Sequence, residues 1–329
     1  MEPTTTARVF EAIANFQIDG EVVEAKPYGS GHINDTLRVC LRLAGGVERL
    51  YTLQRINTDI FTDPAALMDN IAGVTDFLRE IITAEGGNPE RETLRIIRSH
   101  EGLPYYLDSA GSCWRMYSYI DHAYTLDQIE NPESFYQSGL GFGNFQRRLA
   151  DYPAETLHET IPRFHDTVDR LRLFEEAVER DTAGHVNEIT AEIDFVRARE
   201  EFAHRFVDLQ AQGELPLRVT HNDTKLNNVL LDEATGQALA VIDLDTVMPG
   251  LAMNDFGDSI RFGASTGAED EPDLDKVSCS MEYFEAFTRG FMTGVAGRLT
   301  DLEIELLPVG AQMMTFECGT RFLTDYIDG

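Results

Sequence analysis

The sequence predicts an α+β protein of two lobes, with an antiparallel sheet in the N-terminal lobe and a larger, mainly helical C-terminal lobe. Three observations favour this class. Short apolar segments of strand type alternate with glycine-containing turns up to about residue 120. From Leu126 to about residue 215, apolar residues instead recur at helical spacing. A chain of 329 residues is also long for one hydrophobic core, so we expect lobes at 1–120 and 121–329.

The composition excludes several classes of protein. Acidic residues outnumber basic ones by 57 to 27, and the resulting formal charge of −30 argues against a nucleic-acid partner. No apolar run approaches the roughly 18 residues that span a membrane, and the N-terminus lacks a secretion signal. The 4 cysteines show no C-x-x-C spacing, which favours isolated thiols in a reducing compartment. We therefore expect a cytoplasmic globular protein without a membrane partner.

The first lobe is expected to begin with an amphipathic helix and to continue through short strands. The helix spans residues 4–15, and strands are predicted at 21–27, 37–43, 50–55, 94–98 and 113–119. The segment Y-G-S-G-H-I-N-D-T (28–36) joins the first two strands and contains Gly29 and Gly31. Such a turn can cover nucleotide phosphates, although an ordinary turn is the simpler explanation of two glycines alone.

The stretch 219–245 is the most informative part of the chain. Two apolar runs, 229–231 and 239–242, are separated by a turn that contains glycine, which predicts a β-hairpin. A hairpin brings the loop before its first strand close to the end of its second strand. Asp223, Asn228 and Asp243 should therefore converge.

These residue types in this order are typical of a phosphoryl-transfer site. Asp223 would accept the proton of the substrate hydroxyl, and Asn228 and Asp243 would offer oxygen ligands to Mg2+. Each residue taken alone could equally well cap a turn or bond to the backbone. The complete set at this spacing favours the catalytic interpretation.

The longer motifs resemble the N-acetylhexosamine 1-kinases, within the aminoglycoside phosphotransferase and choline kinase superfamily. The similar strings are Y-G-S-G-H-I-N-D-T (28–36), L-Q-R-I-N-T-D-I-F (53–61), T-H-N-D-T-K-L-N-N (220–228), I-D-L-D-T-V-M-P-G (242–250), N-D-F-G-D-S-I-R-F-G-A-S (254–265) and E-C-G-T-R-F-L-T-D-Y (317–326). This resemblance implies a protein-kinase-like fold that uses ATP and Mg2+. It also implies phosphorylation of the anomeric hydroxyl of N-acetylglucosamine or N-acetylgalactosamine.

The resemblance implies a nucleotide site in the first lobe. Gln54 stands on the third strand, where most kinases carry a lysine, and Asp69 in the helix predicted at 66–78 occupies the place of its acidic partner. The strand 113–119 lies where a kinase hinge would offer backbone groups to adenine. The residues expected to bind the nucleotide are Gly29, Gly31, Gln54, Asp69, Tyr117 and Tyr119.

The acceptor would be contacted by Asp223 together with His32, Phe262 and Arg321. A histidine and an arginine can donate hydrogen bonds to sugar hydroxyls and to an acetamide carbonyl, and Phe262 could supply an apolar wall. Each has a structural alternative. Arg321 could pair with Asp325 one helical turn later, His32 could brace the glycine turn, and Phe262 could belong to the core.

Two other functions are compatible with parts of the sequence. A phosphotransferase for cationic acceptors such as aminoglycosides or choline would suit the acidic chain, but basic residues in the acceptor pocket would not suit such acceptors. A binding module that keeps the fold without catalysis is disfavoured, because Asp223, Asn228 and Asp243 are all present.

Two further expectations concern single segments. Asp255, in a D-F-G triplet, is expected to cap the helix that it opens, because Asp243 occupies the strand-end position of the metal ligand. The related sequences continue beyond the R-F-L-T-D-Y motif, so we expect exposed apolar surface at residues 322–327.

Overall fold

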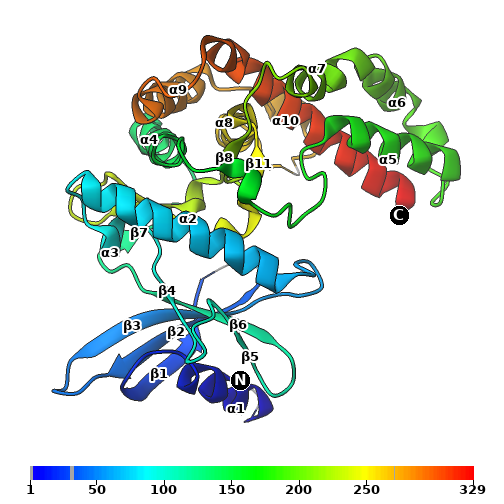
Figure 1. The fold of residues 1–329 in the computed structure, drawn as a ribbon. Coiled ribbons are helices and arrows are strands. Elements are labelled where there is room, and N and C mark those ends of the chain that lie inside the picture. Colours follow the sequence, from blue (N-terminus) through cyan, green and yellow to red (C-terminus); the bar gives the residue numbers. More distant parts are fainter. Residues whose placement is uncertain (1–2, 30–32, 270) are drawn as a thin grey trace. The chain divides into compact units, whose positions relative to one another are not determined.

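The computed structural model describes residues 3–29, 33–269 and 271–329, which pack as two compact units (Figure 1). Unit 1 contains Met1–Tyr124 and the returning segment Leu230–Asp245, and unit 2 contains Thr125–Val229 and Thr246–Gly329. We expected the boundary between residues 120 and 121, and in the structure the first segment of unit 1 ends four residues later, at Tyr124. The returning segment joins unit 1 because its strand β9 (Val229–Asp232) pairs with β7 (Ala123–Tyr124).

Unit 1 is built on an antiparallel sheet in the order β1-β2-β3-β6-β4, with β5 paired to β6. A smaller sheet, in the order β10-β9-β7, contains the predicted hairpin. The remaining elements of unit 1 are α1 (Pro3–Ala14), β1 (Glu21–Pro27), β2 (Asp35–Arg42), β3 (Glu48–Arg55), α2 (Pro64–Ala84), α3 (Pro89–Glu92), β4 (Ile96–Ile97), β5 (Tyr106–Leu107), β6 (Cys113–Ser118) and β10 (Ala238–Val241).

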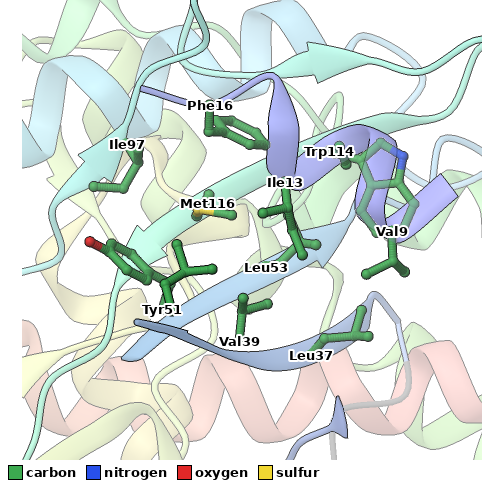
Figure 2. Packing of buried hydrophobic residues seen from close by; sticks show 12 residues of the cluster. Val9, Ile13, Phe16, Leu37, Val39, Tyr51, Leu53, Ile97, Trp114 and Met116 are labelled. Carbon is green, nitrogen blue, oxygen red and sulfur yellow. The ribbon is translucent and has the colours of Figure 1, made fainter. Parts of the chain in front are cut away.

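Helix α1 closes one face of this sheet. Val9 and Ile13 lie one turn apart on the helix and Phe16 follows its end, so their side chains share one face. They pack in one buried cluster with Leu53 of β3 and Met116 of β6, and none of the five is more than 5% exposed. Figure 2 shows the side chains of α1 pointing toward these strands. Burial of side chains of this size stabilises the unit by about 1.5–3 kcal/mol each.

Unit 2 is mainly helical. Its short strands β8 (Arg218–Thr220) and β11 (Met248–Gly250) form an antiparallel pair. Its helices of eight or more residues are α4 (Pro132–Arg148), α5 (Thr167–Arg180), α6 (Thr190–Arg197), α7 (Glu200–Ala211), α8 (Ala252–Gly263), α9 (Met281–Val295) and α10 (Asp301–Asp328). The observed architecture therefore confirms the predicted division into an antiparallel-sheet part and a helical part.

Glycines allow the helices of unit 2 to approach closely. A Cβ atom on Gly290 of α9 would lie 2.0 Å from the backbone oxygen of Tyr136 in α4. One on Gly139 of α4 would lie 2.4 Å from the backbone oxygen of Phe287. Helices α8 and α10 meet in the same way, because a Cβ on Gly257 would lie 2.3 Å from the Gly310 oxygen. Backbone contact at these positions fixes α8, which carries part of the candidate site.

The last turns of α10 are only partly covered. Phe322 and Tyr326 are 42% and 44% exposed, as expected, whereas Ile327 is fully buried in a cluster with Phe174 of α5 and Val196 of α6. Within residues 3–29, 33–269 and 271–329, no helix combines the length and the apolar character needed to cross a membrane.

The contact between α4 and α9 leads to a stability prediction. Gly290→Ala should lower the free energy of unfolding by about 1–3 kcal/mol or more, because the new methyl group meets backbone that cannot move aside. Denaturant unfolding followed by circular dichroism measures this change.

Gly319→Ala in α10 is the matched control, because no atom beyond the adjacent residues and the local helix backbone lies within 4 Å of the added Cβ. This control should be neutral or stabilising by up to about 1 kcal/mol, the difference in helix propensity. A Gly290→Ala protein as stable as its parent would contradict the proposed packing.

Candidate active site

The loop that follows β8 brings together two of the predicted catalytic residues. Asn228 ends the short 3-10 turn Leu226–Asn228, which folds its side chain back toward Asp223. The Asn228 Nδ2 donates to the Asp223 backbone oxygen at 2.8 Å and to Asp223 Oδ2 at 3.2 Å. The Asp223 side chain is 29% exposed, and Lys225 Nζ lies 2.9 Å from its Oδ1. The loop therefore presents a partly exposed carboxylate with its hydrogen-bonding partners already in place.

The beginning of this loop is held by a buried carboxylate from α8. Asp255 is 1% exposed and accepts hydrogen bonds from the backbone nitrogens of His221 at 2.9 Å and Asn222 at 2.8 Å. Gln146 Nε2 donates to the same carboxylate at 2.7 Å. Asn222 adopts a left-handed backbone with φ of 64°, which turns these successive amides toward Asp255. Burial raises the pKa of Asp255, although the His221 ring and the backbone amides oppose this effect.

This role of Asp255 corrects the expectation that it caps α8. The helix begins one turn earlier, and its N-cap position is Leu251, so Asp255 lies inside the helix. Its side chain is therefore directed to the loop after β8 and not to the first amides of its own helix.

A second acid of α8 holds the other side of Asp223. Asp258 Oδ2 accepts from the Thr224 backbone nitrogen at 3.0 Å, and Thr224 Oγ1 donates to the Asp255 backbone oxygen at 2.6 Å. His221 is fully buried, with its ring edge-on to Phe142, and its Nδ1 accepts from the Asp223 backbone nitrogen at 3.3 Å. The residues on both sides of Asp223 are thus fixed, and its carboxylate remains partly accessible.

The third predicted catalytic residue, Asp243, belongs to unit 1. It follows β10, its side chain is exposed, and its backbone is left-handed with φ of 59°. This conformation is rare for residues other than glycine, and such strain is concentrated at functional sites. Two residues later, Asp245 is 5% exposed.

A buried ion pair beside Asp243 was not found from the sequence. Arg115 of β6 is 1% exposed and donates from both terminal nitrogens to the two carboxylate oxygens of Asp245. Burial disfavours the charge on Arg115, but the carboxylate of Asp245, with Tyr117 and Asp243 nearby, raises the pKa of Arg115. The one sequence signal was an arginine in the middle of the otherwise apolar strand C-W-R-M-Y-S.

The predicted nucleotide-binding residues occupy several elements of unit 1. Gly29 has a positive φ of 83°, whereas Gly31 lies outside the described residues. Gln54 Oε1 accepts from Arg115 Nε at 2.9 Å. Asp69 is exposed on α2.

The two predicted hinge tyrosines differ in their surroundings. Tyr117 is 4% exposed, and burial raises the pKa of its phenol. The Tyr119 hydroxyl lies 2.9 Å from the hydroxyl of Tyr28, and burial together with this contact raises the pKa of Tyr119 to about 12.

The predicted acceptor residues other than Asp223 are only partly described. His32 lies outside the described residues. Phe262 of α8 is 37% exposed. Arg321 of α10 is exposed, with its guanidinium 5.2 Å from the centre of the Phe322 ring and 4.0 Å from Cys318 Sγ.

The end of α8 and an interior turn of α10 lie together at Glu269. This residue binds Arg261 Nη1 at 2.6 Å and accepts from Cys318 Sγ at 3.7 Å. Because Arg261 precedes Phe262 and Cys318 lies one turn before Arg321, the two candidate acceptor residues come from neighbouring parts of these helices.

The role of Asp255 can be tested without knowledge of any substrate. Asp255→Ala should lower the free energy of unfolding by about 1–3 kcal/mol, because two buried backbone N–H groups lose their acceptor. Hydrogen exchange of the His221 and Asn222 amides should become faster.

The exposed Asp301→Ala, at the start of α10, is the matched control and should leave both amides protected. Unchanged protection of His221 and Asn222 in Asp255→Ala would show that another group holds the loop.

Solved structures of phosphotransferases have the same fold. A spectinomycin phosphotransferase in complex with ADP and spectinomycin is 13% identical, with a TM-score of 0.56 over 99% of this chain and 87% of that chain. An amicoumacin kinase in complex with AMP-PNP, Ca2+ and Ami is also 13% identical, with a TM-score of 0.57 over 99% and 88%. The GDP complex of an aminoglycoside 2'-phosphotransferase is 13% identical, with a TM-score of 0.52 over 99% and 97%. At this level of identity the similarity shows the fold, and it confirms the kinase-like class.

The sequence itself shows the family. The profile of the phosphotransferase enzyme family matches residues 25–283, which is more than half of the chain. The match includes the loop after β8, the hairpin and helix α8. The chain therefore belongs to the phosphotransferase enzyme family, whose members transfer phosphoryl groups to small-molecule hydroxyls.

Proposed function

We propose that the chain is an ATP- and Mg2+-dependent kinase that phosphorylates the C1 hydroxyl of an N-acetylhexosamine. Family membership supports phosphoryl transfer to a small-molecule hydroxyl, and the motif resemblance supports this acceptor. The observation that carries the proposal is the hydrogen-bonded pair of Asp223 and Asn228, held against α8 by Asp255 and Asp258.

In this proposal Asp223 orients the acceptor hydroxyl and accepts its proton. A sugar C1 hydroxyl is more acidic than an ordinary alcohol, so a carboxylate is an adequate base. Its larger contribution is geometric, because a fixed carboxylate holds the hydroxyl oxygen ready for attack. The neighbouring Lys225 Nζ lies 2.9 Å from Oδ1 and helps to orient the carboxylate.

Asn228 and Asp243 would hold Mg2+. Their donor atoms fit the ion, because Mg2+ prefers carboxylate and carbonyl oxygens. The amide nitrogen of Asn228 donates the two hydrogen bonds to Asp223, and its amide oxygen is the atom suited to a metal. When bound, the ion would offset the charge of the nucleotide phosphates.

The nucleotide would bind to unit 1, with Gly29 and Gly31 over the phosphates and the segment of Tyr117 and Tyr119 beside the base. Gln54 and Asp69 complete the proposed set. ADP and AMP-PNP are present in the complexes of the spectinomycin phosphotransferase and the amicoumacin kinase, which supports an adenine nucleotide here.

The acceptor would be recognised by Arg321, Phe262 and His32. A guanidinium and an imidazole suit neutral hydroxyl and acetamide groups, and Phe262 offers an exposed ring face. The second candidate is a cationic acceptor, which the formal charge of −30 and the spectinomycin complex of one structural neighbour favour. The two candidates differ in the charge that they require at the acceptor site: basic side chains suit a neutral sugar, and an acidic surrounding suits a cation.

A substrate panel decides between these functions. ATP or GTP would be supplied with Mg2+ and one acceptor: N-acetylglucosamine, N-acetylgalactosamine, galactose, choline, kanamycin or spectinomycin. Nucleotide consumption above the acceptor-free rate should appear with ATP and the N-acetylhexosamines. Efficient turnover of kanamycin or choline without turnover of the N-acetylhexosamines would overturn the proposed acceptor.

The role of Asp223 predicts a loss of turnover without a comparable loss of binding. Asp223→Asn keeps the shape and should lower kcat by about 10²–10⁴-fold, because the base is removed. Calorimetric titration should show much smaller changes in sugar affinity. Asp194→Asn, an exposed change on α6, serves as the control. Turnover of Asp223→Asn close to that of the parent would exclude this base.

The role of Arg321 predicts an effect on one substrate only. Arg321→Ala should cost about 1.5–3 kcal/mol of sugar binding, as for a hydrogen bond from a charged donor. The KM for N-acetylglucosamine should rise, and the KM for ATP should stay unchanged.

Arg180→Ala is the control, because this exposed arginine of α5 pairs with Asp328. Equal damage to the use of both substrates by Arg321→Ala would indicate a structural role.

A further inference from the structure

The buried guanidinium of Arg115 lies at the centre of a polar network, and the proposed function gives Arg115 itself no role. Arg115 stands directly across from Gln54 in the register of β6 and β3. Its Nε donates to Gln54 Oε1 at 2.9 Å, and its Nη2 donates to Asp245 Oδ2 at 2.9 Å. A second bond joins its Nη1 to the other Asp245 oxygen. Such a bidentate pair fixes orientation as well as charge.

The network extends to the strand that follows the glycine turn. Gln54 Nε2 donates to Thr36 Oγ1 at 2.9 Å, and Asn34 Nδ2 donates to Asp245 Oδ2 at 2.6 Å. The Asn34 amide oxygen in turn accepts from the Asn57 backbone nitrogen at 2.9 Å. One buried carboxylate, that of Asp245, is therefore held by side chains from separate parts of the sheet.

This carboxylate lies two residues from the proposed metal ligand. Asp243 has a left-handed backbone with φ of 59°, a conformation that persists only where the surrounding structure over-determines it. Leu244 and Asp245 are 2% and 5% exposed, so the chain directly after Asp243 is buried. The Asp243 side chain itself is exposed.

We propose that Arg115 is the positioning residue for Asp243 and that it acts through Asp245. It supplies, from the neighbouring strand, the fixed positive charge that most kinases place at the position of Gln54. The inference rests on the proposed function, in which Asp243 holds the Mg2+ of the nucleotide. Unlike a lysine on β3, Arg115 is buried and bound to Asp245, so it should affect the metal-dependent part of nucleotide binding.

The test measures nucleotide binding without any acceptor. A fluorescent ATP analogue would be titrated into the full chain, once with excess Mg2+ and once with EDTA, and the Tm of each variant would be recorded. The variants are Arg115→Met, Arg115→Lys and the double variant Arg115→Met/Asp245→Leu. Asp243→Asn is the reference for loss of the metal ligand. Arg42→Met is the control, because this arginine of β2 forms an exposed pair with Glu48.

We expect Arg115→Met to weaken binding with Mg2+ by about 10–100-fold, the usual effect of removing a partner behind a metal ligand. Binding in EDTA should stay unchanged. The affinity of Arg115→Lys should lie between those of the parent and Arg115→Met. A lysine keeps the positive charge but cannot bind both carboxylate oxygens at once as a guanidinium does. Arg42→Met should match the parent.

The double variant separates positioning from stability. Two apolar residues avoid an unpaired buried charge, so its Tm should lie close to that of the parent. Its nucleotide binding with Mg2+ should nevertheless be as weak as that of Arg115→Met, because no charged pair fixes the turn after Asp243. If Arg115→Met does not fold, Asn34→Ala takes its place. This change removes a hydrogen bond from an uncharged donor to Asp245. It should weaken nucleotide binding with Mg2+ by less than the change at Arg115 would.

Two results obtained with the variants would overturn the inference. One is a folded Arg115→Met or double variant in which Mg2+ strengthens nucleotide binding as much as it does in the parent. This result would refute the role of Arg115 and leave the proposed function intact. The other is an equal loss with Mg2+ and with EDTA, which would indicate a purely structural pair. A parent protein that binds the analogue equally well in Mg2+ and EDTA would instead refute the proposed metal site, and with it this inference.

Discussion

The loop that carries Asp223 depends on one buried carboxylate, that of Asp255. Two successive backbone amides, from His221 and Asn222, point at this acid, and without it both would be buried and unsatisfied. These hydrogen bonds form only if α8, which carries Asp255, lies at a fixed distance from the end of β8. Backbone contact between Gly257 of α8 and α10 provides that constraint, because any side chain there would push α8 away.

Asp223, which is partly exposed, and Asp243, which is exposed, each have a buried carboxylate near them. Asp223 follows a left-handed residue and is flanked by amides bound to Asp255 and Asp258. Asp243 is itself left-handed and is followed by the buried Asp245. Asp255 accepts hydrogen bonds from two backbone amides beside Asp223, whereas Asp245 accepts from the side chains of Arg115 and Asn34. In the proposed function these buried carboxylates hold the chain around the acids that receive a proton or a metal ion.

The sequence predicted the secondary-structure elements well, because these depend on local patterns. Strand β1 has the predicted bounds of 21–27, since its alternation ends at a proline and a glycine turn. The helix predicted at 66–78 is longer, Pro64–Ala84, because Asp63 caps it and proline starts it. Asp223 and Asn228 lie within one loop, so their contact followed from spacing alone.

Polar contacts between distant segments could not be predicted in this way. The pair of Arg115 and Asp245 joins residues 130 positions apart, so the arginine within an apolar strand gave no indication of which acid it binds. The role of Asp255 was misassigned because the start of α8 was placed too late by one turn, which made an interior residue look like a cap. Both errors concern buried charges, whose partners are set by tertiary packing.

The most direct test of the central claim is the position of the transferred phosphate. The chain would be incubated with ATP, Mg2+ and N-acetylglucosamine labelled with 13C at C1, and the product examined by 31P NMR. We expect a phosphomonoester signal coupled to the labelled carbon and to its proton. A phosphate attached to another carbon, or no sugar phosphate beside rapid phosphorylation of kanamycin, would contradict it.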